Sequence, residues 1–327
     1  MDALEDAADV LVIGAGMAGL MAATTLQRAG RRVTILDKGR GMGGRMATRR
    51  FDGATCDHGA PCLSMTDPAL VEALAGSRAR GALVAWAGVG DPCSAGGHAW
   101  RGHPGMSGLA KDLATGLDVR LETLVTRIAR DASGWRVSTE AGAVFAATSM
   151  ILTIPVPQAL ALMASSGVEL EPVVLDRLRR VEYGRCLAVM AILDGPSRVP
   201  APGSVAPGNG RVARVTDNHQ KGISSLPAVT IHGCHAFSVE HWDRDRMESG
   251  RLLLEAAAPW LGSRVTSFQV HGWRFSQPLA ADPGRFAMGV ESPALLLAGD
   301  GFGEGGVQGA ALSGMAAAKA LLSALGA

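Results

Sequence analysis

In the stretch Asp9-Val-Leu-Val-Ile-Gly-Ala-Gly-Met-Ala-Gly19, an apolar strand runs directly into the pattern G-x-G-x-x-G. Gly14 permits the tight turn that leaves the strand, Gly16 lets the backbone approach a pyrophosphate, and Gly19 lets the following helix pack closely. Asp37 ends the next apolar run, where its carboxylate can accept hydrogen bonds from ribose hydroxyls. The stretch therefore predicts a βαβ unit that binds a dinucleotide, with the phosphates at the N-terminus of its helix.

Two further glycine-rich segments extend this predicted site. Arg40-Gly-Met-Gly-Gly-Arg45 combines adjacent glycines, which permit close approach of the backbone, with an arginine that can donate to a diphosphate. Much later, Leu295-Leu-Leu-Ala-Gly-Asp300 predicts a buried strand, and residues 307–325 predict an apolar helix. We expect Asp300 to bind a ribityl chain and this helix to direct its N-terminus at the pyrimidine ring of a flavin. The pairing of these segments with the first motif indicates non-covalently bound FAD.

Composition excludes several classes of function. The 327 residues are 47% hydrophobic and carry a formal net charge of +1, which favours two globular domains and gives no preference for nucleic acids or membranes. The five cysteines contain no C-x-x-C pair and the eight histidines no ligand spacing, so we expect neither a metal nor a redox dithiol. Residues 1–9 lack the features of a signal peptide, and no apolar run reaches the about 18 residues of a membrane span. We expect a cytoplasmic protein.

The order of the predicted elements indicates an α/β fold. Buried-strand patterns at 10–14 and 150–154, with a helix predicted over 17–29, belong to a Rossmann-type sheet. From residue 158 the pattern changes to mixed strands and helices, including a strand predicted over 265–275. We therefore expect a discontinuous FAD-binding domain and an inserted α+β mixed-sheet substrate domain. The first should comprise residues 1–75, 101–157 and 276–327, and the second residues 76–100 and 158–275.

At this level of detail the chain resembles a known family. The run from Val10 to Arg45 is similar to the FAD-binding start shared by flavin amine oxidases, phytoene desaturases and renalases. The internal segments that resemble renalases, especially bacterial ones, are Cys56-Asp-His-Gly-Ala60, Arg101-Gly-His-Pro-Gly-Met106, Thr216-Asp-Asn-His-Gln220, His271-Gly-Trp-Arg-Phe275 and Ala298-Gly-Asp-Gly301. The resemblance extends over nearly the whole chain and implies an FAD-binding domain of the p-hydroxybenzoate hydroxylase and amine oxidase type.

The resemblance also implies an activity. Renalases take a hydride from the 2- and 6-dihydro isomers of NAD(P)H, pass the electrons to O2 to give hydrogen peroxide, and release NAD(P)+. The flavin itself accepts the hydride, so we expect no catalytic side chain. The residues expected to bind FAD are Gly14, Gly16, Met17, Ala18, Gly19, Asp37, Lys38, Gly44, Arg45, Met46, His58, Gly59, Val125, Gly299, Asp300 and Val307. Those expected to bind substrate are Ala60, Pro61, Cys62, Leu63, Tyr183, Trp273 and Gly301.

The chain departs from the renalase pattern at positions expected to meet substrate. Pro61-Cys62-Leu63 stands where the family has Gln-Tyr-Phe, Lys221 is displaced from the family's Asp-Asn-Ser-Lys, and Gly272 replaces an arginine. Two other functions therefore stay open: a flavin-dependent amine oxidase or desaturase acting on another small molecule, and a catalytically silent flavin-binding protein. Bleaching of the flavin by an amine would favour the amine oxidase.

Overall fold

The computed structural model describes residues 8–86, 99–131 and 133–326, so residues 1–7 of the acidic start and 87–98 of the expected substrate segment lie outside it. The chain forms two compact units. The first comprises residues 1–44, 110–182 and 278–327, and the second comprises residues 45–109 and 183–277. In the part of the chain that the structure describes, no helix has the length and apolarity needed to cross a membrane.

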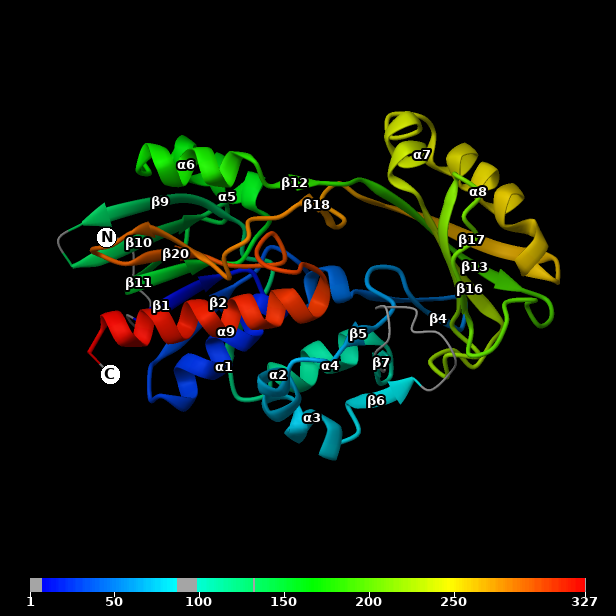
Figure 1. Ribbon diagram of the computed structural model, residues 1–327, viewed down its shortest axis with the longest axis horizontal. Helices are drawn as coiled ribbons and strands as arrows, with labels where there is room; N and C mark the ends of the chain where they lie inside the picture. Colours follow the sequence, from blue (N-terminus) through cyan, green and yellow to red (C-terminus); the bar gives the residue numbers. More distant parts are fainter. Residues whose placement is uncertain (1–7, 87–98, 132, 327) are drawn as a thin grey trace. The chain divides into compact units, whose positions relative to one another are not determined.

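The first unit is built on a mixed eight-stranded sheet, in which β19, β20, β11, β1, β2 and β8 follow one another and β10 and β9 extend from β11 (Figure 1). The pairs β1–β11, β1–β2, β11–β20 and β2–β8 are parallel. Their bounds are β1 Ala8–Ile13, β2 Val33–Leu36, β8 Asp118–Arg120, β9 Val125–Asp131, β10 Gly134–Thr139, β11 Val144–Leu152, β19 Ala287–Val290 and β20 Leu295–Leu297.

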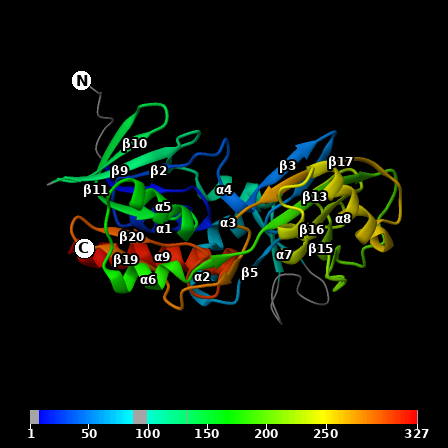
Figure 2. The same cartoon turned by 90° about the horizontal axis from the view of Figure 1, so that it is seen from above.

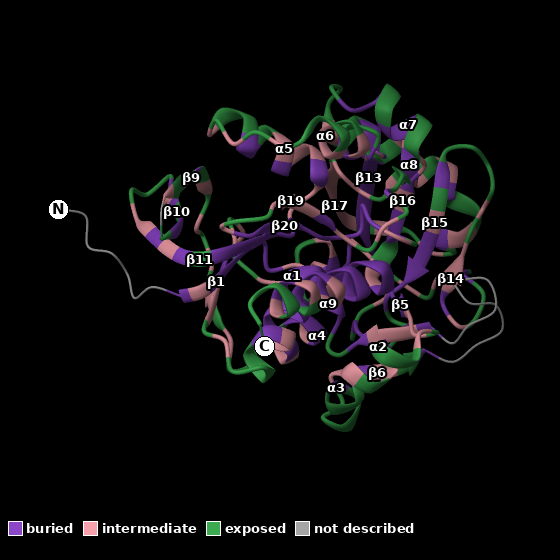
Figure 3. Ribbon diagram, turned by 60° about the vertical axis from the view of Figure 1, so that its left-hand side comes forward, coloured by how far each residue is buried: buried purple, intermediate pink, exposed green. Residues whose placement is uncertain are grey.

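Two helices of the first unit pack against each other, α1 (Met17–Arg28) and α9 (Gly306–Ala324). Gly314 allows their backbones to approach closely, since a Cβ atom at this position would lie 2.1 Å from the carbonyl oxygen of Ala18. Figure 3 shows buried residues along β1, β11 and α9. The outer helices α5 (Val156–Ser165) and α6 (Pro172–Arg179) contact β9 and β19.

The second unit contains a five-stranded antiparallel sheet in the order β14-β15-β16-β13-β17. On one face, α7 (His235–Glu240) and α8 (Arg246–Leu261) enclose an apolar core with Leu187, Val189 and Leu253. The strand bounds are β13 Cys186–Leu193, β14 Ser204–Val205, β15 Val212–Asp217, β16 Ala228–Gly233 and β17 Val265–Trp273.

The opposite face of this sheet carries a hairpin formed by β3 (Thr48–Phe51) and β4 (Ala54–Asp57). Figure 2 shows β3 beside β17, and hydrogen bonds join Arg49 to Gln269 at 3.2 Å and Ser267 to Asp52 at 2.9 Å. The remaining elements are η1 Gly44–Met46, β5 Leu63–Ser64, α2 Pro68–Ala73, α3 Ala75–Ala79, β6 Leu83–Trp86, β7 Ala99–Gly102, α4 Met106–Leu113, β12 Glu182–Tyr183 and β18 Pro278–Ala280.

The predicted fold class is confirmed: a Rossmann-type α/β sheet is combined with a second, mixed α and β structure. The two units divide the chain differently from the expected domains. Residues 45–75 and 101–109 pack in the second unit, because the β3–β4 hairpin covers its sheet. Residues 158–182 pack in the first unit, where the Ser166 hydroxyl accepts a hydrogen bond from the Ile128 amide at 3.0 Å.

Candidate functional site

The first half of the candidate nucleotide site lies where β1 turns into α1. Gly14 adopts a φ of 111°, which only glycine takes easily, and a Cβ on Gly19 would lie 1.9 Å from the Gly14 carbonyl oxygen. Gly16 is the N-cap of α1 without a capping side chain, and a Cβ there would meet no atom within 4 Å. The start of α1, which includes Met17 and Ala18, therefore has no side-chain cap and has free space beside Gly16, as a bound diphosphate requires.

Asp37 lies beside this turn. Its Oδ2 accepts a hydrogen bond from the Ala15 amide at 2.7 Å, and its Oδ1 accepts one from Gly39 at 2.6 Å. Gly43 donates to the Ala15 carbonyl at 2.7 Å, and a Cβ on Gly44 would lie 3.6 Å from Gly16 Cα. The structure thus brings Asp37 and the Gly43-Gly44 pair to the same turn, while Lys38 beside them is exposed.

The late glycine motif meets the first one at Thr153, which follows β11. The Thr153 hydroxyl donates to the carbonyls of Ile13 and Gly14, at 3.0 and 2.9 Å, and its own carbonyl would lie 3.8 Å from a Cβ on Gly299. Asp300 comes next and is buried. The early and the late glycine motif are therefore neighbours at the carboxyl edge of the sheet, where α/β folds bind nucleotides.

The loop from Gly301 to α9 is held by an acid that the sequence did not single out. The Asp282 amide donates to the Gly301 carbonyl at 2.8 Å, and the Asp282 carbonyl accepts from Gly303 at 2.7 Å. Its side chain is buried and lies 2.6 Å from the Arg177 Nε atom. Helix α9 then begins at Gly306 without a capping side chain, and Val307 occupies its first turn. A Cβ on Gly306 would meet nothing within 4 Å, so there is free space beside the first residue of this helix as well.

These observations fit FAD. Two helix N-termini lack side-chain caps beside glycines with open space, and Asp37 and Asp300 lie on the strand ends between them. Of the other predicted contacts in this unit, Val125 begins β9 and pairs with Thr139. The Rossmann turn would hold the ADP half, and the Gly299–Val307 segment the flavin half.

In the second unit, Arg45 connects three segments of the predicted site. Its carbonyl accepts the Ala60 amide at 2.8 Å, and a Cβ on Gly59 would lie 1.9 Å from that same oxygen. Its guanidinium donates to the Phe275 carbonyl at 3.2 Å and lies 5.5 Å from the Tyr183 ring centroid. Arg45, Gly59, Ala60 and Tyr183 therefore lie together, whereas the neighbouring Met46 is buried.

A cluster of aromatic rings adjoins the same segment. His58 stacks on Trp273, with ring centroids 5.3 Å apart, and meets the edge of His271 at 4.9 Å. The Trp273 Nε1 atom donates to the His58 carbonyl at 2.7 Å, and His232 Nε2 lies 3.3 Å from that carbonyl oxygen. His58 and Trp273 were predicted site residues. His232 and His271 were not, although period-two alternation along β16 and β17 places both on the face toward the hairpin.

These histidines are held neutral. Burial, followed by electrostatic repulsion that protonation would meet from His271 and Arg49, lowers the pKa of His58 to about 3. Burial lowers the pKa of His232 to about 4, and burial with Arg49 and Arg246 lowers that of His271. The cluster is therefore a group of uncharged rings with the cationic side chains of Arg49 and Arg246 nearby.

The remaining predicted substrate residues lie outside the ring cluster. The Pro61 carbonyl accepts a hydrogen bond from the Lys221 ammonium. Cys62 is buried against Trp86 and Ala99 and is disulfide-bonded, so it is not a free thiol. Leu63 is buried and pairs with Trp100 through β5 and β7. Gly301 lies in the first unit, in the loop held by Asp282.

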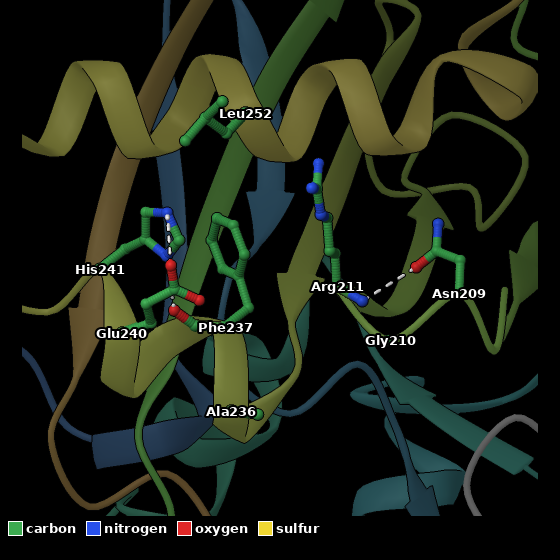
Figure 4. A pocket seen from close by; sticks show the side chains of 8 residues that line it. All are labelled: Asn209, Gly210, Arg211, Ala236, Phe237, Glu240, His241 and Leu252. Carbon is green, nitrogen blue, oxygen red and sulfur yellow. Dashed lines mark hydrogen bonds and ion pairs between the residues drawn. The ribbon is translucent and has the colours of Figure 1, made fainter.

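A separate surface hollow lies beside α7 and α8 in the second unit (Figure 4). Its lining includes the stacked pair Phe237 and His241, with ring centroids 4.1 Å apart, and the side chains of Arg211 and Glu240. Its lining includes none of the predicted site residues. The hollow therefore contributes nothing to the nucleotide site.

Comparison with known proteins identifies the class. The family model of NAD(P)-binding Rossmann-like domains matches residues 12–75, and that of flavin containing amine oxidoreductases matches residues 75–322. The chain belongs to the flavin-containing amine oxidoreductase family. More particularly, it is a renalase-like, FAD-dependent oxidase, as the sequence motifs predicted.

The relatives agree with this assignment. Renalase from Mus musculus is 26% identical over 341 residues, covering 95% of this chain and 98% of that protein. Putrescine oxidase from Kocuria rosea is 48% identical over 56 residues, 17% of this chain and 12% of its own.

Solved structures share the fold. A putative protoporphyrinogen oxidase from Exiguobacterium sp. 255-15 superposes with a TM-score of 0.72 at 15% identity, covering 98% of this chain and 99% of its own. Wild-type putrescine oxidase bound to putrescine has a TM-score of 0.73 at 16% identity, covering 97% and 99%.

We expect Asp37→Ala to weaken FAD binding by roughly 10- to 100-fold, because a carboxylate that accepts from ribose contributes about 1.5–3 kcal/mol. The variant also leaves the Ala15 and Gly39 amides without their acceptor. Fluorescence titration of the apoprotein with FAD measures the dissociation constant, with the exposed Asp118→Ala as control. Unchanged affinity would remove Asp37 from the site.

We expect acid to destabilise the folded protein before most carboxylates titrate. The pKa of His58 is lowered in the fold, so its contribution is complete above about pH 6.5 and is lost as the pH falls toward 3. Between about pH 5.5 and pH 4 this loss approaches about 1.4 kcal/mol per pH unit, and it is about half as steep at pH 6.5. Urea unfolding across this range should give a shallower pH dependence for His58→Gln than for the exposed His103→Gln. Equal slopes would contradict the assignment.

Proposed function

We propose that this protein oxidises the 2- and 6-dihydro isomers of NAD(P)H, with O2 as the electron acceptor. One dihydronicotinamide, one O2 and one proton give one NAD(P)+ and one H2O2. The observation that carries the proposal is the group of uncharged rings of His58, His271 and Trp273, with the cationic side chains of Arg49 and Arg246 nearby. The resemblance to renalase over nearly the whole chain supports the same substrate class.

The charges around these rings disfavour the alternative amine substrate. A protonated amine is a cation, which a site binds with a carboxylate or with several ring faces. Among the contacts described for His58, His271 and Trp273 there is no carboxylate. The adjoining Asp57 is paired with Lys221 at 2.5 Å. Arg49 and Arg246 add positive charge near His271, which suits a dinucleotide with a diphosphate better than an ammonium group.

When bound, FAD supplies the hydride acceptor and the route of electrons to O2. The protein supplies binding and orientation. Asp37 and the start of α1 would hold the ADP half, and Asp300 with the start of α9 the flavin half. Trp273, with the buried His58 ring stacked against it, would provide a ring contact for the dihydronicotinamide. Because the three histidines have lowered pKa values, they would not place a positive charge against the nicotinamide cation that forms.

Anaerobic mixing tests the proposal. The FAD-loaded protein is combined with 2-dihydroNAD(P), 6-dihydroNAD(P), ordinary NAD(P)H or putrescine, and the visible flavin absorbance is followed. We expect rapid bleaching by at least one dihydro isomer, and recovery with formation of H2O2 when air is admitted. Bleaching by putrescine alone would establish the amine oxidase. Failure of both isomers to bleach a fully loaded protein would overturn the proposal.

A further inference from the structure

Two of the renalase-like motifs meet at a buried ion pair that the proposed chemistry does not use. Lys221 Nζ lies 2.5 Å from Asp57 Oδ2, and both side chains are completely buried. The residues come from the Cys56–Ala60 motif and from the turn after Thr216–Gln220, 164 positions apart. Burying two charges is expensive, and an apolar pair of similar volume usually stabilises a fold as well. Stability alone therefore does not explain why the fold buries this ion pair.

The Lys221 side chain also contacts the backbone of the predicted substrate segment, in addition to Asp57. Its ammonium also donates to the Pro61 carbonyl and lies 5.3 Å from the Trp86 ring centroid. The lysine is itself fixed, because its amide donates to the Asp217 carbonyl at 3.0 Å. The Asp217 carboxylate in turn accepts the amides of His219 and Gln220. The ammonium thus presents a fixed donor to residue 61.

Asp57 begins the segment of residues 57–61, whose other end, Pro61, accepts the hydrogen bond from Lys221. Asp57 is fixed by hydrogen bonds of its own. Its Oδ1 accepts from the Thr48 hydroxyl at 2.5 Å and from the Met106 amide at 2.9 Å. Its own amide donates to Asn218 Oδ1 at 3.2 Å, and its carbonyl accepts from the Thr230 hydroxyl at 2.9 Å. Residue 57 is consequently held at its side chain and at both backbone groups.

Between these ends lie the backbone groups that meet the ring cluster. The His58 carbonyl accepts from Trp273, and the Ala60 amide donates to Arg45. We propose that Lys221, acting through Asp57 and the Pro61 carbonyl, is a positioning residue for hydride transfer. It sets the conformation of residues 58–60, and so the placement of the His58 and Trp273 rings against the donor. This inference rests on the proposed function for the identity of the donor.

Three variants separate positioning from stability. Lys221→Met leaves Asp57 as a buried, unpaired carboxylate and should lower the melting temperature sharply. The double variant Asp57→Asn/Lys221→Met removes both charges, so its melting temperature should recover while Pro61 still lacks its donor. Leu253→Ala is the control, because Leu253 is buried on the α8 face of the sheet, away from the hairpin. It destabilises the same unit without touching residues 57–61.

Stopped-flow reduction of the FAD-loaded proteins at saturating dihydronicotinamide gives the decisive comparison. We expect the double variant to reduce its flavin about 100-fold more slowly than the wild type, with the donor dissociation constant nearly unchanged. Leu253→Ala should retain the wild-type rate. A double variant that reacts at the wild-type rate would overturn the inference, as would an equal slowing in Leu253→Ala.

A measurement without donor keeps this inference distinct from the proposed function. Hydrogen exchange of the amides of residues 58–60, and the visible spectrum of bound FAD, should match the wild type in Leu253→Ala. In the double variant the amides should exchange faster and the spectrum should shift. If no dihydro isomer reduces the wild type, the proposed function fails, and these two readouts still decide whether Lys221 positions the segment. Unchanged exchange and spectrum in the double variant would refute it.

Discussion

Gly16→Ala is expected to weaken FAD binding by roughly 10- to 100-fold while leaving the apoprotein folded and as stable as the wild type. The methyl group would meet no protein atom within 4 Å, and the residue has an ordinary φ of −76°, so the chain itself accepts alanine. The same methyl group would project into the space where the diphosphate approaches the start of α1. Loss of one charge-assisted hydrogen bond, at about 1.5–3 kcal/mol, sets the size of the effect.

Gly19→Ala is the matched comparison, three residues away on the same helix. There the methyl carbon would lie 1.9 Å from the Gly14 carbonyl oxygen and 2.8 Å from the Thr153 hydroxyl. We expect this variant to lower the free energy of unfolding of the apoprotein as well as the affinity for FAD. Isothermal titration with FAD and urea unfolding of the apoproteins measure the two effects separately. If Gly16→Ala lowered stability as much as Gly19→Ala, or bound FAD normally, the assignment of the diphosphate site would fail.

The Rossmann part of the fold was predictable because its signals are local. The strand predicted at 10–14 is β1, and the helix predicted over 17–29 is α1, which ends at Arg28. A terminal helix was expected from Val307 and begins one residue earlier. Each signal is a run of apolar residues bounded by glycine, whose meaning needs no knowledge of distant segments.

The contacts that complete the site were not predictable in this way. Lys221 pairs with Asp57 across 164 positions, and Thr153 joins the two glycine motifs without a pattern of its own. Asp282 holds the Gly301 loop from a segment that carries no motif. Single polar residues such as these acquire their role only from tertiary packing. The boundaries of the units shifted for the same reason, since the β3–β4 hairpin belongs with a sheet formed by residues far along the chain.

Gly59→Ala is expected to cost at least the about 1–3 kcal/mol typical of overpacking. Its methyl carbon would lie 1.9 Å from the Arg45 carbonyl oxygen and 3.4 Å from the Trp273 ring. The backbone would have to separate, which breaks the 2.8 Å hydrogen bond from Ala60 to Arg45 and adds about 1 kcal/mol. Residues 58–60 and the stacked His58 and Trp273 rings would then move apart, so hydride transfer should fall together with stability.

Gly76→Ala provides the control, because Gly76 lies in α3 of the same unit and the nearest atoms that a methyl group there would meet belong to the flexible Arg80 guanidinium, at 3.0 Å. Urea unfolding followed by tryptophan fluorescence measures the loss of stability, and anaerobic flavin reduction measures the loss of transfer in the protein that stays folded. A folded Gly59→Ala protein that reduces its flavin at the wild-type rate would show that the close approach of Gly59 to the Arg45 carbonyl has no part in the chemistry. Slowing at Gly59 but not at Gly76 would place the rate-determining geometry in the same short segment that Lys221 and Asp57 hold at either end.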